Sequence, residues 1–98
     1  MTIEMKKTDA QTVLEVSGRL DTTTAPVLDK TMIEEVSEKT ALVLDLKELA
    51  YISSAGLRVL LSAQKRMRKH GSMKLRNVRE EIMEVFEMTG FADILEIE

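Results

Sequence analysis

The sequence predicts an α/β fold, with a mixed central β-sheet of about four to five strands and three to four helices packed on it. Two observations lead to this prediction. The apolar residues recur at every second position in some segments and at every third or fourth position in others, which are the repeats of strands and helices. The chain has 98 residues, enough for one hydrophobic core and too few for a second. We therefore expect a single domain over residues 1–98, with helices covering the sheet.

Two strands are expected at the start of the chain. Ile3 and Met5 alternate with polar residues in TIEMKKT, and Leu14 and Val16 do so in TVLEVSG. A short polar turn at residues 8–10 separates the two segments. The alternation predicts two half-buried strands that this turn connects.

The first helix is expected in RLDTTTAPVLDKTMIEEVSEK, which follows these strands. Thr22, Thr23 and Thr24 offer hydroxyls for its N-cap, and Pro26 suits its first turn. One helical stripe collects the apolar side chains Leu28, Met32, Ile33 and Val36. We expect this stripe to face the sheet.

A central strand is expected in ALVLDL, residues 41–46. This segment is almost continuously apolar, which is typical of a strand that is covered on both faces. The side chains that should be buried there are Leu42, Val43, Leu44 and Leu46.

A second helix is expected from about Ser54 to Lys69, closed by Gly71. Its buried stripe consists of Leu57, Leu60, Leu61 and Met67. A short strand in SMKLRNV should then point Met73 and Leu75 inward.

The last third of the chain predicts one more helix and one more strand. REEIMEVFEMTG has a helical stripe and ends at Gly90, and FADILEI is expected as a final extended segment. The inward side chains of these two segments should be Ile82, Val85, Phe86, Phe91, Ile94, Leu95 and Ile97.

Composition excludes several classes of function. The absence of cysteine removes disulfides and thiolate catalysis, and one histidine cannot build a multi-histidine metal site. The four glycines are far apart, so no glycine-rich phosphate loop exists. A net charge of −3 disfavours nucleic acid as a partner, and no apolar stretch approaches the length of a membrane span. We expect a cytoplasmic protein that is not an enzyme, requires no cofactor and does not insert into membranes.

The segment YISSAGL, residues 51–57, carries the most informative polar residues. Ser53 or Ser54 should lie at a helix N-terminus, where free backbone N–H groups favour negative charge. Gly56 weakens a helix by about 0.5–1 kcal/mol relative to alanine, which is understandable if something approaches the backbone closely. The residues alone favour a plain serine N-cap, with phosphorylation of a serine as the alternative hypothesis.

Nearly the whole chain resembles STAS domains, in particular the bacterial anti-sigma factor antagonists. The resemblance rests on LVLDLKELAYISSAGLRVLLSAQKRMRKHG, on VSGRLDTTTAP upstream, and on the layout of MKLRNVREEIMEVFEMTGFADILEI downstream. The serine loop and the Gly-x-Leu-Asp motif together make it specific.

The resemblance implies a phosphoprotein that regulates transcription by partner switching. The unphosphorylated antagonist would bind an anti-sigma factor that is also a serine kinase. Phosphorylation of the helix-capping serine, which aligns with Ser54, would release it. A PP2C-type serine phosphatase would reverse the modification. The partner-binding residues that the resemblance implies are Asp21, Thr22, Ser53, Ser54, Gly56, Leu57 and Arg58.

One position departs from the family pattern. The family often has aspartate immediately before the acceptor serine, whereas this chain has Ser53, which is itself a possible acceptor. The main alternative is a non-switching STAS accessory subunit of a transporter or signalling scaffold. Nucleotide binding near Asp21 and Ser54 is a weaker third hypothesis.

Overall fold

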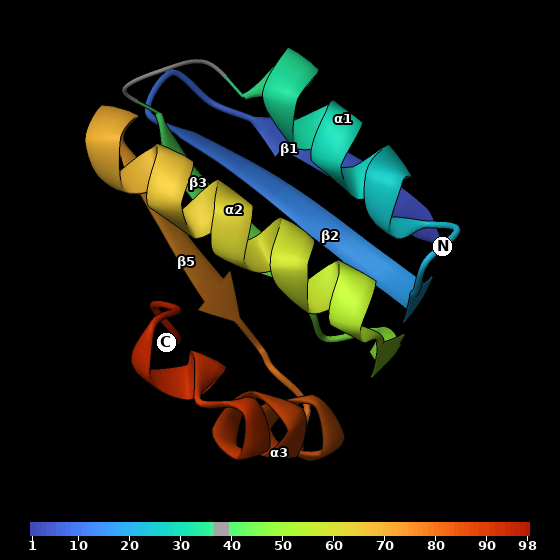
Figure 1. Cartoon of the computed structure of the whole chain (residues 1–98). Coiled ribbons are helices and arrows are strands. Elements are labelled where there is room, and N and C mark those ends of the chain that lie inside the picture. Colours follow the sequence, from blue (N-terminus) through green and yellow to red (C-terminus); the bar gives the residue numbers. More distant parts are fainter. Residues whose placement is uncertain (37–39) are drawn as a thin grey trace.

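Five strands and three α-helices form the fold in the computed structural model, which describes residues 1–36 and 40–98 (Figure 1). In chain order the elements are β1 (Thr2–Lys7), β2 (Gln11–Leu20), α1 (Ala25–Glu35), β3 (Ala41–Asp45), β4 (Leu49–Ile52), α2 (Ser54–His70), β5 (Ser72–Arg76), α3 (Glu80–Thr89) and the short 3-10 helix η1 (Phe91–Asp93). The expectation of a mixed sheet with helices packed on it is confirmed.

The long strand β2 organises the sheet. It pairs antiparallel with β1 along one side, and its first half pairs parallel with β3, which pairs parallel with β5. Its last residues pair parallel with β4, after an irregularity between Gly18 and Arg19. The carboxyl ends of β2 and β4 therefore lie next to each other.

Helices α1 and α2 lie side by side on one face of the sheet, and α3 lies at the lower edge in Figure 1, against β4. The buried core between these helices and the sheet includes Leu14, Leu28, Met32, Leu42, Leu44, Leu60, Met67, Met73, Leu75, Ile82 and Phe86. These residues confirm the apolar stripes expected for the strands and for all three helices. The α2 helix is closed by Gly71, whose N–H donates to Met67 O at 2.8 Å, as expected.

Among the described residues, no helix covers the other face of the sheet, so the expectation that the central strand is covered on both faces is wrong. Val43 is buried there, in register between Val13 and Lys74. Around it lie two ion pairs, Lys6 with Glu15 at 2.6 Å and Arg76 with Asp45 at 3.5 Å. Neighbouring strands, rather than a second helical layer, shield the apolar side chain.

Several side chains differ from their expected burial. Ile33 is 57% exposed because it points away from the sheet, although it neighbours the buried Met32. In the edge strand β1, Ile3 is half-buried and Met5 is exposed. Leu61 and Val85 are only half-buried, since they lie at the margins of their helical stripes.

The C-terminal segment is not the final strand that its apolar residues suggested. Residues 91–93 form η1, and only a single bridge joins Ile97 to Leu75. Leu95 N–H donates to Phe91 O at 2.9 Å, so the segment coils locally before it reaches β5. Within the part of the chain that the structure describes, no helix is long and apolar enough to cross a membrane.

Candidate functional site

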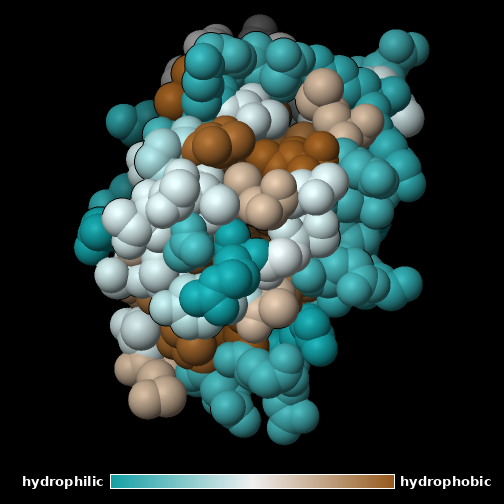
Figure 2. Space-filling model, turned by 90° about the vertical axis from the view of Figure 1, so that its right-hand side faces the viewer, coloured by the Kyte–Doolittle hydropathy of each residue, from teal (hydrophilic) through white to brown (hydrophobic). Residues whose placement is uncertain are grey.

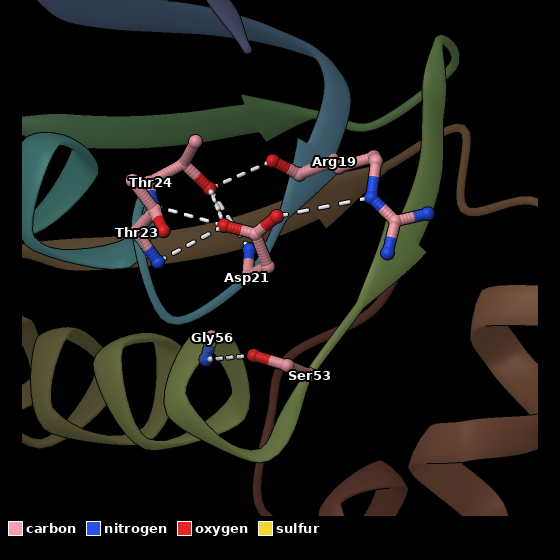
Figure 3. A network of polar contacts seen from close by, with 6 residues as sticks. All are labelled: Arg19, Asp21, Thr23, Thr24, Ser53 and Gly56. Atoms are coloured by element: carbon pink, nitrogen blue, oxygen red, sulfur yellow. Dashed lines mark hydrogen bonds and ion pairs between the residues drawn. The ribbon is translucent and has the colours of Figure 1, made fainter.

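The expected site forms where β2 and β4 end. Leu20 and Ile52 are register partners in these parallel strands, and Ser53 N–H donates to Leu20 O at 2.9 Å. Asp21 and Ser53 are therefore the first residues after two adjacent strands, at the edge of the sheet where α/β proteins commonly bind ligands. Figure 3 shows the two turns beside each other.

The turn after β2 is held by Asp21. Its Oδ1 accepts hydrogen bonds from the backbone N–H groups of Thr23 at 3.0 Å and Thr24 at 3.1 Å. The Thr24 hydroxyl accepts from Asp21 N–H at 2.8 Å and lies 2.7 Å from Arg19 O, to which it donates. Every polar group named here is thus engaged inside the turn.

This network corrects the expected cap of α1. Thr24 occupies the N-cap position, but its hydroxyl makes no capping bond to the helix. The Asp21 carboxylate takes the N–H groups of the preceding turn instead, as aspartate side chains do in Asx turns. The hydrogen bond from Thr24 N–H, followed by those from the Thr24 hydroxyl and Thr23 N–H, holds the pKa of Asp21 below its usual value, against an opposing desolvation.

Arg19 and Tyr51 belong to this region and were not predicted from the sequence. The Arg19 guanidinium lies 4.1 Å from the centre of the Tyr51 ring, and its Nε lies 3.7 Å from Asp21 Oδ2. Arg19 and Tyr51 are register partners in β2 and β4, so their contact depends on a strand pairing that the sequence pattern did not reveal. This pair flanks Asp21 with a positive charge and an aromatic surface.

Ser53 and Ser54, at the start of α2, have different environments. Ser53 is the N-cap, with extended backbone, and its hydroxyl accepts a hydrogen bond from Gly56 N–H at 3.3 Å. Ser54 is the first helical residue and is exposed, and its hydroxyl makes no hydrogen bond to any residue of the described ranges. The description of Ser54 as the capping serine is therefore wrong, because Ser53 fills that position.

Gly56 packs against the ends of strands β2 and β4. A Cβ atom at this position would lie 2.8 Å from Leu20 Cγ, 2.9 Å from Ile52 Cγ1 and 3.0 Å from Leu20 O. Glycine is thus required because α2 begins directly on the ends of β2 and β4. The close approach expected from the sequence exists, and the approaching group belongs to the chain itself.

The remaining expected residues divide between core and surface. Leu57 is only 7% exposed and belongs to the hydrophobic core, so its side chain does not form the surface of the site. Thr22 and Arg58 are exposed and line a groove between α1 and α2. Asp21, Thr22, Ser53, Ser54 and Arg58 thus lie at one end of the molecule, over Gly56 and Leu57.

The polar groups of the site are hydroxyls, one carboxylate and two guanidinium groups, from Thr22, Ser53, Ser54, Asp21, Arg19 and Arg58. In the part of the chain that the structure describes, no group of three or more Asp, Glu or His side chains could hold a metal ion. What the arrangement offers is an accessible hydroxyl at a helix N-terminus, beside a carboxylate that its own turn keeps ionised.

Comparison with known proteins identifies the family to which the chain belongs. A family model described as the STAS domain matches residues 2–98. The anti-sigma-B factor antagonist of Bacillus subtilis is 30% identical over 96 residues, covering 97% of this chain and 88% of that protein. Its counterpart in Listeria monocytogenes is 34% identical over 100 residues, covering 99% of this chain and 88% of that protein.

A solved structure agrees with these relatives. The crystal structure of an anti-sigma factor antagonist from Mycobacterium paratuberculosis matches with a TM-score of 0.86 and 25% identity, over 98% of this chain and 83% of that one. Because the family model and the relatives both span almost the full length of the sequence, the chain belongs to the STAS domain family.

Proposed function

We propose that this protein is an anti-sigma factor antagonist that switches partners through phosphorylation of Ser54. In the unphosphorylated state it binds an anti-sigma factor that is also a serine kinase, which frees a sigma factor. The relatives named anti-sigma-B factor antagonists support the binding role. The observation that carries the switch is the exposed hydroxyl of Ser54 at the start of α2, which makes no hydrogen bond to another residue of ranges 1–36 and 40–98.

The phosphorylation step uses only this hydroxyl and the ATP of the kinase. Ser54 Oγ attacks the γ-phosphorus of ATP, a new O–P bond forms, and the bond from the γ-phosphorus to the bridging oxygen breaks. ADP leaves, and the hydroxyl proton passes to a base of the kinase. A PP2C-type phosphatase hydrolyses the same ester and returns the protein to its binding state.

The structure favours Ser54 over Ser53 as acceptor. The Ser53 hydroxyl accepts a hydrogen bond from Gly56 N–H and the residue is half-buried, so a kinase would reach it less readily than the exposed Ser54. A phosphate on Ser54 would add about −1.5 to −2 charge at a helix N-terminus, where negative charge is tolerated. The domain should therefore stay folded while the partner surface changes its charge.

The added charge explains release. A partner that covers Ser54 must remove water from the phosphate, and Asp21 already supplies a nearby carboxylate held ionised by its turn. Any acidic group of the partner would then be repelled. Binding without the phosphate and release with it follow from the same surface.

Calorimetry with the anti-sigma factor kinases of the source genome tests this function. Wild type and Ser54→Ala should bind one of them equally, and only wild type should gain one phosphate with Mg-ATP, as read by intact mass. Ser54→Glu should bind about 30-fold more weakly or worse. Equal binding of Ser54→Glu, or a phosphate that persists in Ser54→Ala, would contradict the switch and favour a constitutive accessory subunit.

A further inference from the structure

The surface between α1 and α2 contains a groove that the phosphorylation site does not explain. Its volume is about 290 Å³. Ala25 from α1 and Ala55 and Val59 from α2 give it apolar walls. The lining positions on α2 recur every three or four residues from 55 to 62, so the groove follows that helix for about two turns.

One charged group on each helix borders the groove. Asp29 Oδ1 is shielded from solvent and accepts no hydrogen bond from any residue in ranges 1–36 and 40–98. Arg58 is exposed and has no ion pair with a carboxylate in those ranges. Asp29 is half-buried and lines the groove, so its carboxylate and the Arg58 guanidinium can each pair with an opposite charge of another molecule.

The groove is continuous with the phosphorylation site. Thr22, at one end of the groove, directly follows Asp21, and Arg58 lies one helical turn after Ser54. Figure 2 looks onto this end of the molecule, where brown hydrophobic patches lie among white and teal, more polar side chains. A partner that covers Ser54 can therefore extend into the groove without leaving the surface.

We propose that the groove receives an amphipathic helix of the anti-sigma factor. An aliphatic side chain of that helix packs between α1 and α2, a lysine or arginine donates to Asp29, and a carboxylate pairs with Arg58. A helix suits a groove that two other helices form, because side-chain ridges pack into such grooves. This inference rests on the proposed function and adds the chemistry by which the partner is recognised.

Charge variants on both sides of the groove test the docking mode by calorimetry with the kinase that binds wild type. Asp29→Asn keeps the shape of the side chain and removes its charge, and Arg58→Glu reverses a charge on the surface. Each should weaken binding about 10-fold or more, since each removes one partner of a charge pair. Lys74→Glu is the matched control, because Lys74 is exposed on the opposite face of the sheet and should leave affinity unchanged.

Stability and crosslinking separate docking from folding. Asp29→Asn should unfold at about the same temperature as wild type, because no residue in ranges 1–36 and 40–98 donates a hydrogen bond to Asp29 Oδ1 in the free protein. A photo-reactive residue in place of Ser62, which lines the groove, should crosslink to a helix of the kinase that carries an aliphatic residue beside a basic one. The same probe at Lys74 should not crosslink.

Each result has a defined meaning. If Ser54→Glu abolishes binding while Asp29→Asn and Arg58→Glu bind like wild type, the switch stands and the groove proposal is overturned. If no kinase binds wild type, both proposals fall. If the chain alone forms a dimer that Arg58→Glu dissociates, the occupant is a second copy and the proposed helix is wrong.

Discussion

The two helices that cover the sheet begin in different ways, although each follows one of two neighbouring parallel strands. Before α1, the Asp21 carboxylate and the Thr24 hydroxyl are both engaged in hydrogen bonds within the turn. At the start of α2, the Ser53 hydroxyl accepts one bond, and the Ser54 hydroxyl has no partner among the described residues. The hydrogen bonds fix the shape of the turn before α1. The start of α2 leaves the hydroxyl of Ser54 exposed at the end of a helix.

This difference separates the groups that fix the two turns from an exposed hydroxyl within a few residues. The groups that fix the turns are Asp21, Ser53 and Gly56, and Ser54 contributes to neither turn through its side chain. Substitutions at the first three positions should therefore change folding, whereas substitutions at Ser54 should change binding. The following predictions test that division, beginning with the largest expected effect on stability.

Replacing Gly56 with valine should cause the largest loss. The first added carbon already lies 2.8 Å from Leu20 Cγ and 2.9 Å from Ile52 Cγ1, and two more must fit into the same core. Overpacking of this kind costs about 2–3 kcal/mol in the free energy of unfolding. Urea denaturation measures it, with Ser62→Val on an exposed position of the same helix as the control. That control should stay within about 0.5 kcal/mol of wild type, because serine and valine have similar helix propensities, and equal losses in both variants would refute the tight contact.

Replacing Ser53 with alanine should cause the next largest loss. The variant leaves Gly56 N–H without its acceptor, and such a cap contributes about 1 kcal/mol. Ser54→Ala is the matched variant at the neighbouring position and should stay within about 0.5 kcal/mol of wild type. Thermal unfolding of the pair decides which serine caps α2, and a larger loss in Ser54→Ala would reverse the assignment.

The same contrast shows what the sequence could reveal. Helix α2 and strand β5 were predictable because their apolar residues follow one period over their whole length, and strand β3 because it is almost continuously apolar. Gly56 and the two serines also marked the start of a helix. Which serine caps it depends on a difference of one residue in the helix boundary, and local patterns do not resolve helix ends to that degree.

Features that depend on tertiary contacts could not be predicted. The four residues of strand β4 show no clear alternation of apolar and polar side chains. The strand forms by parallel pairing with the end of β2. The contact of Arg19 with Tyr51 follows from that pairing. The spacing of the apolar residues in the C-terminal segment is compatible with a strand or with a turn. Residues 91–93 form η1, and the sequence pattern alone does not distinguish the two.

Lowering the pH should weaken the turn before α1. The pKa of Asp21 is lowered in the folded protein, so its charge stabilises the fold above the unfolded-state pKa of about 3.9, and this contribution is lost as the pH falls through the folded-state value. Asp21→Asn retains an oxygen acceptor and does not titrate. The melting temperature of wild type should therefore fall relative to that of Asp21→Asn between about pH 5 and pH 3. A constant difference across this range would show that the charge of Asp21 contributes nothing.

The smallest effect on stability should come from Ser54→Glu, and its sign should be opposite. Ser54 is the first residue of α2, so a carboxylate there meets the positive end of the helix dipole and should stabilise the domain by about 0.3 kcal/mol. Ser62→Glu, in the exposed middle of the same helix, is the control without that gain, and 1 M salt should remove the difference between them. The same Ser54→Glu variant should lose about 30-fold or more in partner affinity. A stable fold with lost binding means that phosphorylation acts by charging the contact surface. Destabilisation by more than about 1 kcal/mol would instead mean that phosphate releases the partner by melting the first turn of α2.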